Sequence, residues 1–269
     1  MSTKLKNSVR GIVLGCVAGC VVAAVPHAAN ADGPTSRPAR HAFAWTPPTD
    51  GAPSNLSSAT ARSACEADQN LGASVLAPNA YVGTTTQESP VLYWYTTKPT
   101  IMKIRVTMVR DNDLNNPSPL FNVVYRDPLA AGIQSIDLSS PLAVMDADDK
   151  PIGEAHPIKL EENVKYRWSV HLCSPDGASQ DVVSEAIIMR VKPEASLTAA
   201  LGAAGDDYEK ANAYAKAHVW YDMLASLSTL IDKNPADPML RAQRTKLLSA
   251  EKLPLLSDKL KTWAVPPGA

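Results

Sequence analysis

Three carboxylates lie close together in the sequence, at Asp146, Asp148 and Asp149. Clustered carboxylates on a loop are the hard oxygen ligands that Ca²⁺ prefers. A complete calcium loop would continue to a bidentate acidic residue, whereas Lys150 and Pro151 follow immediately. We therefore expect a solvated hairpin turn here and no metal site.

Motifs that would identify an enzyme do not occur after residue 31. The sequence there contains no G-x-S-x-G, H-E-x-x-H, Walker loop, dinucleotide-binding glycine pattern or C-x-x-C. Ser249 and Lys252 form an S-x-x-K pattern, but no S-D-N or K-T-G element accompanies it. The histidines have no metal-ligand spacing to one another or to cysteine: His41, His156, His171 and His218. We predict a protein that is not an enzyme and holds no cofactor or metal.

One pair of aromatic residues could recognise sugars. Tyr93 and Tyr95 lie two residues apart in an apolar run, so a strand would put both on one face and Trp94 on the other. Exposed aromatic pairs can stack on sugar rings, but such a face more commonly belongs to the core, with the hydroxyls at its rim. Both alternatives stay open, and Trp45 is a further aromatic candidate.

The charge balance argues against polyanionic partners. The 26 Lys and Arg residues face 27 Asp and Glu residues, which gives a formal net charge of −1. No basic footprint for nucleic acid or for an anionic lipid surface exists at this balance. The 45% of hydrophobic residues suffices for a core, and the 22 prolines indicate many turns.

The first 31 residues are typical of a secretory signal. Lys4, Lys6 and Arg10 precede an apolar run from residue 11 to 25, and small residues at 29 and 31 fit cleavage after Ala31. We therefore predict a periplasmic or secreted protein. Cleavage of the signal removes three basic residues and no acidic one, so the formal net charge of the remaining chain is −4.

Two alternatives to a cleaved signal remain open. The apolar run is too short for a comfortable membrane anchor, since the hydrocarbon core is about 30 Å thick. Residues 17–20 resemble a bacterial lipobox with Cys20 as the lipid-modified residue, although the apolar run continues beyond it. We expect membrane attachment only if Cys20 is lipidated, which would make the chain a lipid-anchored envelope protein.

Two cysteines remain after cleavage, Cys65 and Cys173. In an oxidising compartment an even number with none left over predicts one disulfide, and a pair of buried free thiols is the alternative. A closed loop of roughly 108 residues would stabilise the fold by about 4–5 kcal/mol in the loop-entropy model. In a regular strand Cys173 would point to the same side as Arg167 and to the opposite side from Trp168, so the disulfide would lie at the outside or the rim of a sheet.

Residues 63–192 alternate with the period of β-strands. Apolar residues at 102, 104, 106 and 108 and at 164, 166, 168, 170 and 172 alternate with polar ones. Shorter runs at 91–97, 120–126, 133–138 and 182–191 are separated by turn-forming clusters, among them residues 146–153. We predict an antiparallel β-sandwich that is immunoglobulin-like but not a true immunoglobulin domain.

Residues 32–62, rich in proline, are expected to form a flexible linker whose Phe43 and Trp45 could dock on the folded part.

The period changes to that of helices in residues 193–262. A stripe that includes Trp220, Leu224, Leu227 and Leu230 follows helical spacing, and an earlier helix precedes it, so we predict a helical hairpin and a packing seam at these four residues. Pro238 marks the start of a third helix. The α+β chain should end in a frayed tail at residues 263–269.

Three stretches together resemble a bacterial envelope family catalogued as domain of unknown function 928. They are residues 83–95 (GTTTQESPVLYWY), residues 165–173 (KYRWSVHLC) leading to 181–183, and residues 218–225 (HVWYDMLA) with Asn234 and Pro235. The resemblance spans about residues 65–250. It departs at Ala64, where a turn-forming residue is expected, and at Met223, where a small alanine is usual. The family implies secretion, a β-domain and a helical tail, and a weak link to envelope sensing or transport, but no catalytic residues.

The helical tail separately resembles one tetratricopeptide-type unit. Ala211, Tyr214, Leu224, Leu227 and Pro235 stand near that repeat's positions. One unit cannot bury both of its faces, so it must pack on the sandwich, on a second copy or on a partner. We therefore expect a non-catalytic adaptor with an unidentified protein partner in the cell envelope. The alternative is a cell-wall or glycan-binding module using Tyr93 and Tyr95.

Overall fold

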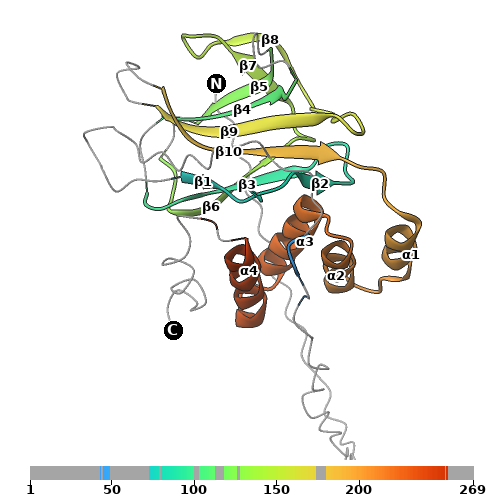
Figure 1. Ribbon diagram of the computed structural model, residues 1–269. Helices are drawn as coiled ribbons and strands as arrows, with labels where there is room; N and C mark the ends of the chain where they lie inside the picture. Colours follow the sequence, from blue (N-terminus) through green and yellow to red (C-terminus); the bar gives the residue numbers. More distant parts are fainter. Residues whose placement is uncertain are drawn as a thin grey trace, which may run out of the picture. The chain divides into compact units, whose positions relative to one another are not determined.

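Strands fill the first part of the described chain and helices fill the last part (Figure 1). The computed structural model describes residues 43, 45–48, 73–78, 80–99, 103–112, 118–125, 128–173, 180–251 and 253. Its strands are β1 (Ala73–Val75), β2 (Gly83–Thr85), β3 (Val91–Thr96), β4 (Lys103–Arg110), β5 (Pro119–Tyr125), β6 (Gly132–Asp137), β7 (Leu142–Met145), β8 (Pro151–His156), β9 (Lys165–Cys173) and β10 (Gln180–Arg190). Its helices are α1 (Ala195–Ala203), α2 (Asp207–Lys216), α3 (Trp220–Lys233) and α4 (Pro238–Ala250). The predicted α+β class is confirmed.

The largest sheet has the strand order β2-β10-β9-β4-β5. Trp168 and Val170 of β9 lie opposite Met108 and Val106 of β4, and these four side chains are fully buried. Polar residues alternate with them, which explains the period of two that predicted both strands. One pairing differs from the expectation of an antiparallel sheet, because β2 runs parallel to β10. The sheet is therefore mixed.

A second sheet, β1-β3-β6, is antiparallel throughout. Its strand β1 contacts both β9 and β10 of the large sheet. Side chains from the two sheets share one core, with Trp94 from β3 and Trp168 from β9 among its largest members. The two sheets therefore share one core, which also includes side chains from the helices.

Strands β7 and β8 form a two-stranded hairpin, of which the sequence predicted the turn but not the two strands. We expected a turn from Asp146 to Gly153, but β8 already begins at Pro151. All six residues of β8 are exposed. A strand with no buried face has no apolar alternation, so its period carries no signal.

Helix α3 connects the helices to the sheets, because it contacts β2 and β3 as well as α2 and α4. The predicted seam residues Trp220, Leu224, Leu227 and Leu230 are all buried. The indole Nε1 of Trp220 donates to the carbonyl of Leu76 at 2.9 Å. Helix α1 was not predicted separately: only Leu197 of its residues is buried, so it has no apolar stripe.

Helices α2 and α4 begin at side-chain caps. Asp206 accepts from the backbone N–H of Glu209 before α2, and Asp237 accepts from that of Met239 before α4. Each cap satisfies a backbone donor that the first helical turn leaves unpaired. Pro238 stands in the first turn of α4, as predicted.

Several predictions fall on residues outside the described part of the chain. These are the signal with its cleavage after Ala31, the lipid attachment at Cys20, the cysteine Cys65 of the proposed disulfide and the tail 263–269. They stay predictions. None of the described helices is long and apolar enough to cross a membrane.

Candidate functional site

Two aromatic residues of the proline-rich region dock on the helices. We call Phe43 and residues 45–48 the docked segment. The ring of Phe43 stacks on Tyr208 of α2 with centroids 4.7 Å apart. The ring of Trp45 meets Trp220 edge-on at 5.3 Å and His218 at 5.7 Å. These ring contacts hold the docked segment, blue in Figure 1, against the helical part.

A buried carboxylate fixes the docked segment to two other parts of the chain. The indole Nε1 of Trp45 donates to Glu251 Oε1 at 2.8 Å, and the hydroxyl of Tyr81 donates to the same oxygen at 2.7 Å. Glu251 is only 6% exposed. Burial raises the pKa of Glu251 and also that of Tyr81. The end of α4, the loop before β2 and the docked segment therefore meet at one polar contact inside an apolar environment.

Beyond Trp45, the docked segment reaches an apolar groove of about 380 Å³. Pro48 lines one side of the groove. Its floor includes the buried side chains of Val82, Leu197 and Val219. Met189 is a partly exposed wall residue from the end of β10. The groove thus lies where the large sheet, α1 and the turn between α2 and α3 come together.

The turn between α2 and α3 is held in an unusual conformation at this groove. His218 has a φ of 56°, a left-handed value that non-glycine residues seldom adopt. Its carbonyl accepts from the Thr84 hydroxyl at 3.3 Å, and the next residue, Val219, donates its N–H to the Tyr214 carbonyl at 3.0 Å. These bonds fix the turn relative to β2, so the groove has a defined wall.

The groove combines apolar contact surface with three exposed titratable residues, His218, Lys192 and Glu194. Lys192 and Glu194 are exposed charges at its edge. Aromatic-lined apolar grooves bind extended proline-containing segments, which lose little conformational entropy because they are already extended. This groove was not predicted from the sequence. The available signal was the pair Pro47 and Pro48, which follows Trp45 with one residue between.

The predicted sugar-stacking pair is not displayed on the surface. Tyr95 is 2% exposed and Trp94 is 1% exposed. Tyr93 is half-buried and packs against the core. Burial raises the pKa of both tyrosines. The burial of Tyr95 favours the alternative of core packing and has a physical reason: β3 is the central strand of its sheet and α3 also contacts it. The buried ring of Tyr95 therefore offers no exposed face on which a sugar could stack.

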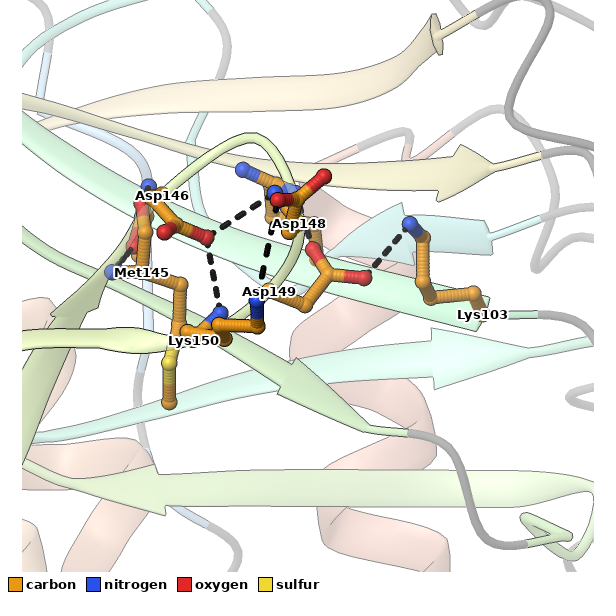
Figure 2. A network of polar contacts seen from close by, with 8 residues as sticks. Lys103, Met145, Asp146, Asp148, Asp149 and Lys150 are labelled. Atoms are coloured by element: carbon orange, nitrogen blue, oxygen red, sulfur yellow. Dashed lines mark hydrogen bonds and ion pairs between the residues drawn. The ribbon is translucent and has the colours of Figure 1, made fainter.

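The three clustered aspartates have separate roles in the β7–β8 turn, as Figure 2 shows. Asp146 Oδ1 accepts from the backbone N–H of Asp148 at 2.9 Å and of Lys150 at 2.8 Å. Asp149, with a φ of 59°, pairs instead with Lys103 and Arg105 of β4. Its side chain is 5% exposed, so the expectation of a fully solvated turn is wrong for this residue.

The carboxylates of this turn do not converge on one point that could hold a cation. Asp148 is exposed and points to Lys150 at 3.8 Å. Across the part of the chain that the structure describes, no group of three or more His, Cys, Asp or Glu residues is placed to bind a metal ion. Within this turn Asp146 holds the backbone, and Asp149 fastens the hairpin to β4 of the large sheet.

Comparison with known proteins adds the family but no activity. No curated protein matches the sequence. A family model does match, over residues 57–260, and it confirms the resemblance drawn from the three sequence stretches. The chain belongs to the family described as Domain of Unknown Function (DUF928).

Proposed function

We propose that this protein is a non-catalytic adaptor of the cell envelope whose apolar groove binds an extended, proline-containing segment of a partner protein. The observation that carries the proposal is the position of Pro48, which lines the groove from the chain's own docked segment. The chain thus provides an example of the ligand chemistry that this groove accepts. A partner segment of the same chemistry would take the same place.

The groove has the properties that such a ligand needs. Its buried floor is apolar, so an entering side chain loses contact with water and gains packing. The Tyr81 ring beside it is fixed by the bond to Glu251, so the aromatic wall is preorganised. Preorganised walls reduce the entropy lost on binding. The exposed charges of Lys192 and Glu194 supply a polar rim.

The architecture supports an adaptor in a second way. We infer that the two larger sheets form a β-sandwich and that α2 and α3 form a helical hairpin on it, similar to a tetratricopeptide unit. In this arrangement the seam from Trp220 to Leu230 is used for packing within the chain. The partner would therefore meet the groove beside the hairpin, and the seam itself would stay covered.

A site-directed cross-linking experiment tests the proposal. A photoreactive amino acid is placed at Met189, in the groove, or at Met239, which is 60% exposed on α4. We expect a discrete protein adduct from position 189 in cells and none of the same mass from position 239. A synthetic peptide of residues 42–50 should compete with this adduct, because it carries the docked segment.

A matched pair of substitutions separates binding from folding. Met189→Lys puts a charge on the groove wall, and Met239→Lys makes the same change on an exposed helix surface. For this comparison the photoreactive amino acid replaces Lys192, an exposed residue at the edge of the same groove, and we expect loss of its adduct only for Met189→Lys, with both variants melting near the parent. The proposal is wrong if equal adducts form at both positions, or if the Met189→Lys variant retains its partner.

A further inference from the structure

A second cavity, lined by a different set of residues, differs from the groove in its chemistry. It is a cleft of about 410 Å³ between α2, α3 and the β2–β3 turn. Side chains with hydroxyl, amide, carboxylate or ammonium groups line most of it. The volume falls within the roughly 300–1,000 Å³ of small-molecule sites. The cleft is therefore suited to a small polar ligand.

Helix α3 carries a polar stripe that faces this cleft. Asp222, Ala225, Ser226, Thr229 and Lys233 all line the cavity, and their spacing of three, four, seven and eleven residues from the first puts them on one helical face. This stripe runs beside the apolar seam of the same helix. A charged residue at 222, inside an otherwise apolar stretch, was the available sequence signal.

One wall of the cleft is fixed by a buried carboxylate. Asp222 is 4% exposed and accepts from the backbone N–H of Thr86 at 2.9 Å and from the hydroxyls of Thr85 and Thr86. The Thr85 hydroxyl in turn accepts from the N–H of Gln87 at 3.1 Å. These bonds hold the β2–β3 turn on α3, so the side chains of Gln87 and Ser89 stand at defined positions in the cleft.

The charges in the cleft do not favour an anionic ligand. Lys233 and Lys210 both pair with Asp207, at 2.5 Å and 3.5 Å. Their interaction lowers the pKa of Asp207, which is therefore ionised. Three carboxylates and two ammonium groups line the cavity, the third carboxylate being Asp137 at the end of β6. Burial raises the pKa of Asp222, and with or without its charge the cavity has no excess of positive charge that would attract an anion.

A neutral ligand rich in hydroxyl groups fits this set of partners. Its hydroxyls can donate to Asp137 and accept from Gln87 or from the lysine ammonium groups. The cleft also has apolar surface from Pro90 and Ala225 and the half-buried ring of Tyr214, which suit the less polar face of a sugar ring. We propose that this cleft is a binding site for a neutral carbohydrate.

Direct binding to purified protein tests this site independently of any protein partner. Isothermal titration uses the full exported chain with cello-oligosaccharides, malto-oligosaccharides and N-acetylglucosamine oligomers, and with galacturonic acid oligomers as the anionic comparison. We expect saturable binding of at least one neutral series and none, or at least about tenfold weaker binding, of the anionic series.

Substitutions that fill the cleft locate the binding. Thr229 is exposed at the cleft, so Thr229→Trp should fold and reduce affinity at least about tenfold, and Ser226→Trp should do the same from the neighbouring turn. Ser249→Trp, on the exposed surface of α4, is the matched control and should bind as the parent does. Circular dichroism and thermal melting confirm that each variant is folded.

Three results would overturn the inference. They are no binding by any neutral series, unchanged affinity in folded Thr229→Trp, and tighter binding of the galacturonic acid oligomers. Absent binding or an unchanged affinity would mean that no carbohydrate binds in the cleft. Tighter binding of the galacturonic acid oligomers would contradict the argument from the charges of the cleft. Each is distinguishable from failure of the adaptor proposal, because no partner protein takes part in the titration.

Discussion

Replacing Gly83 by alanine should destabilise the protein through one defined collision. A Cβ atom at position 83 would lie 2.7 Å from Cε2 of Tyr221 and 3.4 Å from its Cζ. The ring cannot easily retreat, since Tyr221 is fully buried and its hydroxyl accepts from Trp168 Nε1 at 3.0 Å. Strand β2 or helix α3 must therefore shift.

The magnitude follows from two opposing effects. Overpacking a buried site costs about 1–3 kcal/mol. A Gly→Ala change also lowers the conformational entropy of the unfolded chain, which stabilises the folded protein by about 0.4–1 kcal/mol. We expect a net loss of about 1–2 kcal/mol, which lowers the melting temperature of a chain of this size by roughly 2–8 °C.

A matched control and a double variant make the Gly83 test sharp. Gly202, in α1, has no atom within 4 Å of a built Cβ, so Gly202→Ala should raise stability by up to about 1 kcal/mol through helix propensity. Both variants are measured by urea unfolding and calorimetry. Gly83→Ala combined with Tyr221→Ala should lose less than the sum of the two single changes. A Gly83→Ala protein as stable as the parent would refute the close packing of α3 on β2.

Three further predictions concern stability. Leu227→Asp buries a charge in the seam and should cost several kcal/mol, whereas an unchanged melting curve would show that the seam faces solvent. Burial raises the pKa of Glu251 in the folded protein, so ionisation of this carboxyl destabilises the fold as the pH rises through the folded pKa. Glu251→Gln keeps an acceptor oxygen and cannot ionise, so it should stabilise the protein at pH 7 but not at acidic pH. An equal change in stability at the two pH values would contradict this prediction. Reductant should lower the melting temperature if Cys65 and Cys173 are bridged, and an unchanged midpoint would remove the bridge.

The amphipathic elements were predictable because one of their faces is buried and the other is not. Strands β4 and β9 lie side by side with Met108 opposite Trp168, so every second residue of each is apolar. Helix α3 buries Trp220, Leu224 and Leu227 along one stripe. In each case the core imposes a period on the sequence, and the period can be read without the structure.

Elements without a buried face could not be predicted in this way, and for an element with two buried faces the pattern predicted the strand but not which of its side chains are exposed. Strand β8 is exposed throughout, and α1 buries only Leu197, so neither has a periodic signal. Strand β3 has the opposite difficulty: Trp94 and Tyr95 are both buried, because the strand is central in its sheet and in contact with α3. Alternation then gives no information on which ring is available to a ligand.

The two cavities could not be predicted because their walls come from distant segments. Pro48, Met189 and Leu197 meet only after folding, and the same holds for Gln87 and Lys233. A local sequence pattern describes one face of one helix or strand, whereas a cavity is lined by several elements that are distant in the sequence. The isolated signals, a Trp-x-Pro-Pro stretch and an aspartate in an apolar helix, indicated where to look but not what lay opposite.

The segment after Gly83 connects the two proposed sites and lets one set of variants separate them. Thr86 lines the groove, and its N–H and hydroxyl bind Asp222 of the cleft. A shift of this segment, as in Gly83→Ala, should therefore weaken both partner capture and carbohydrate binding. Met189→Lys should weaken only the first and Thr229→Trp only the second. If all three variants lost both activities together, the two cavities would act as one site, and the assignment of separate ligands to them would be wrong.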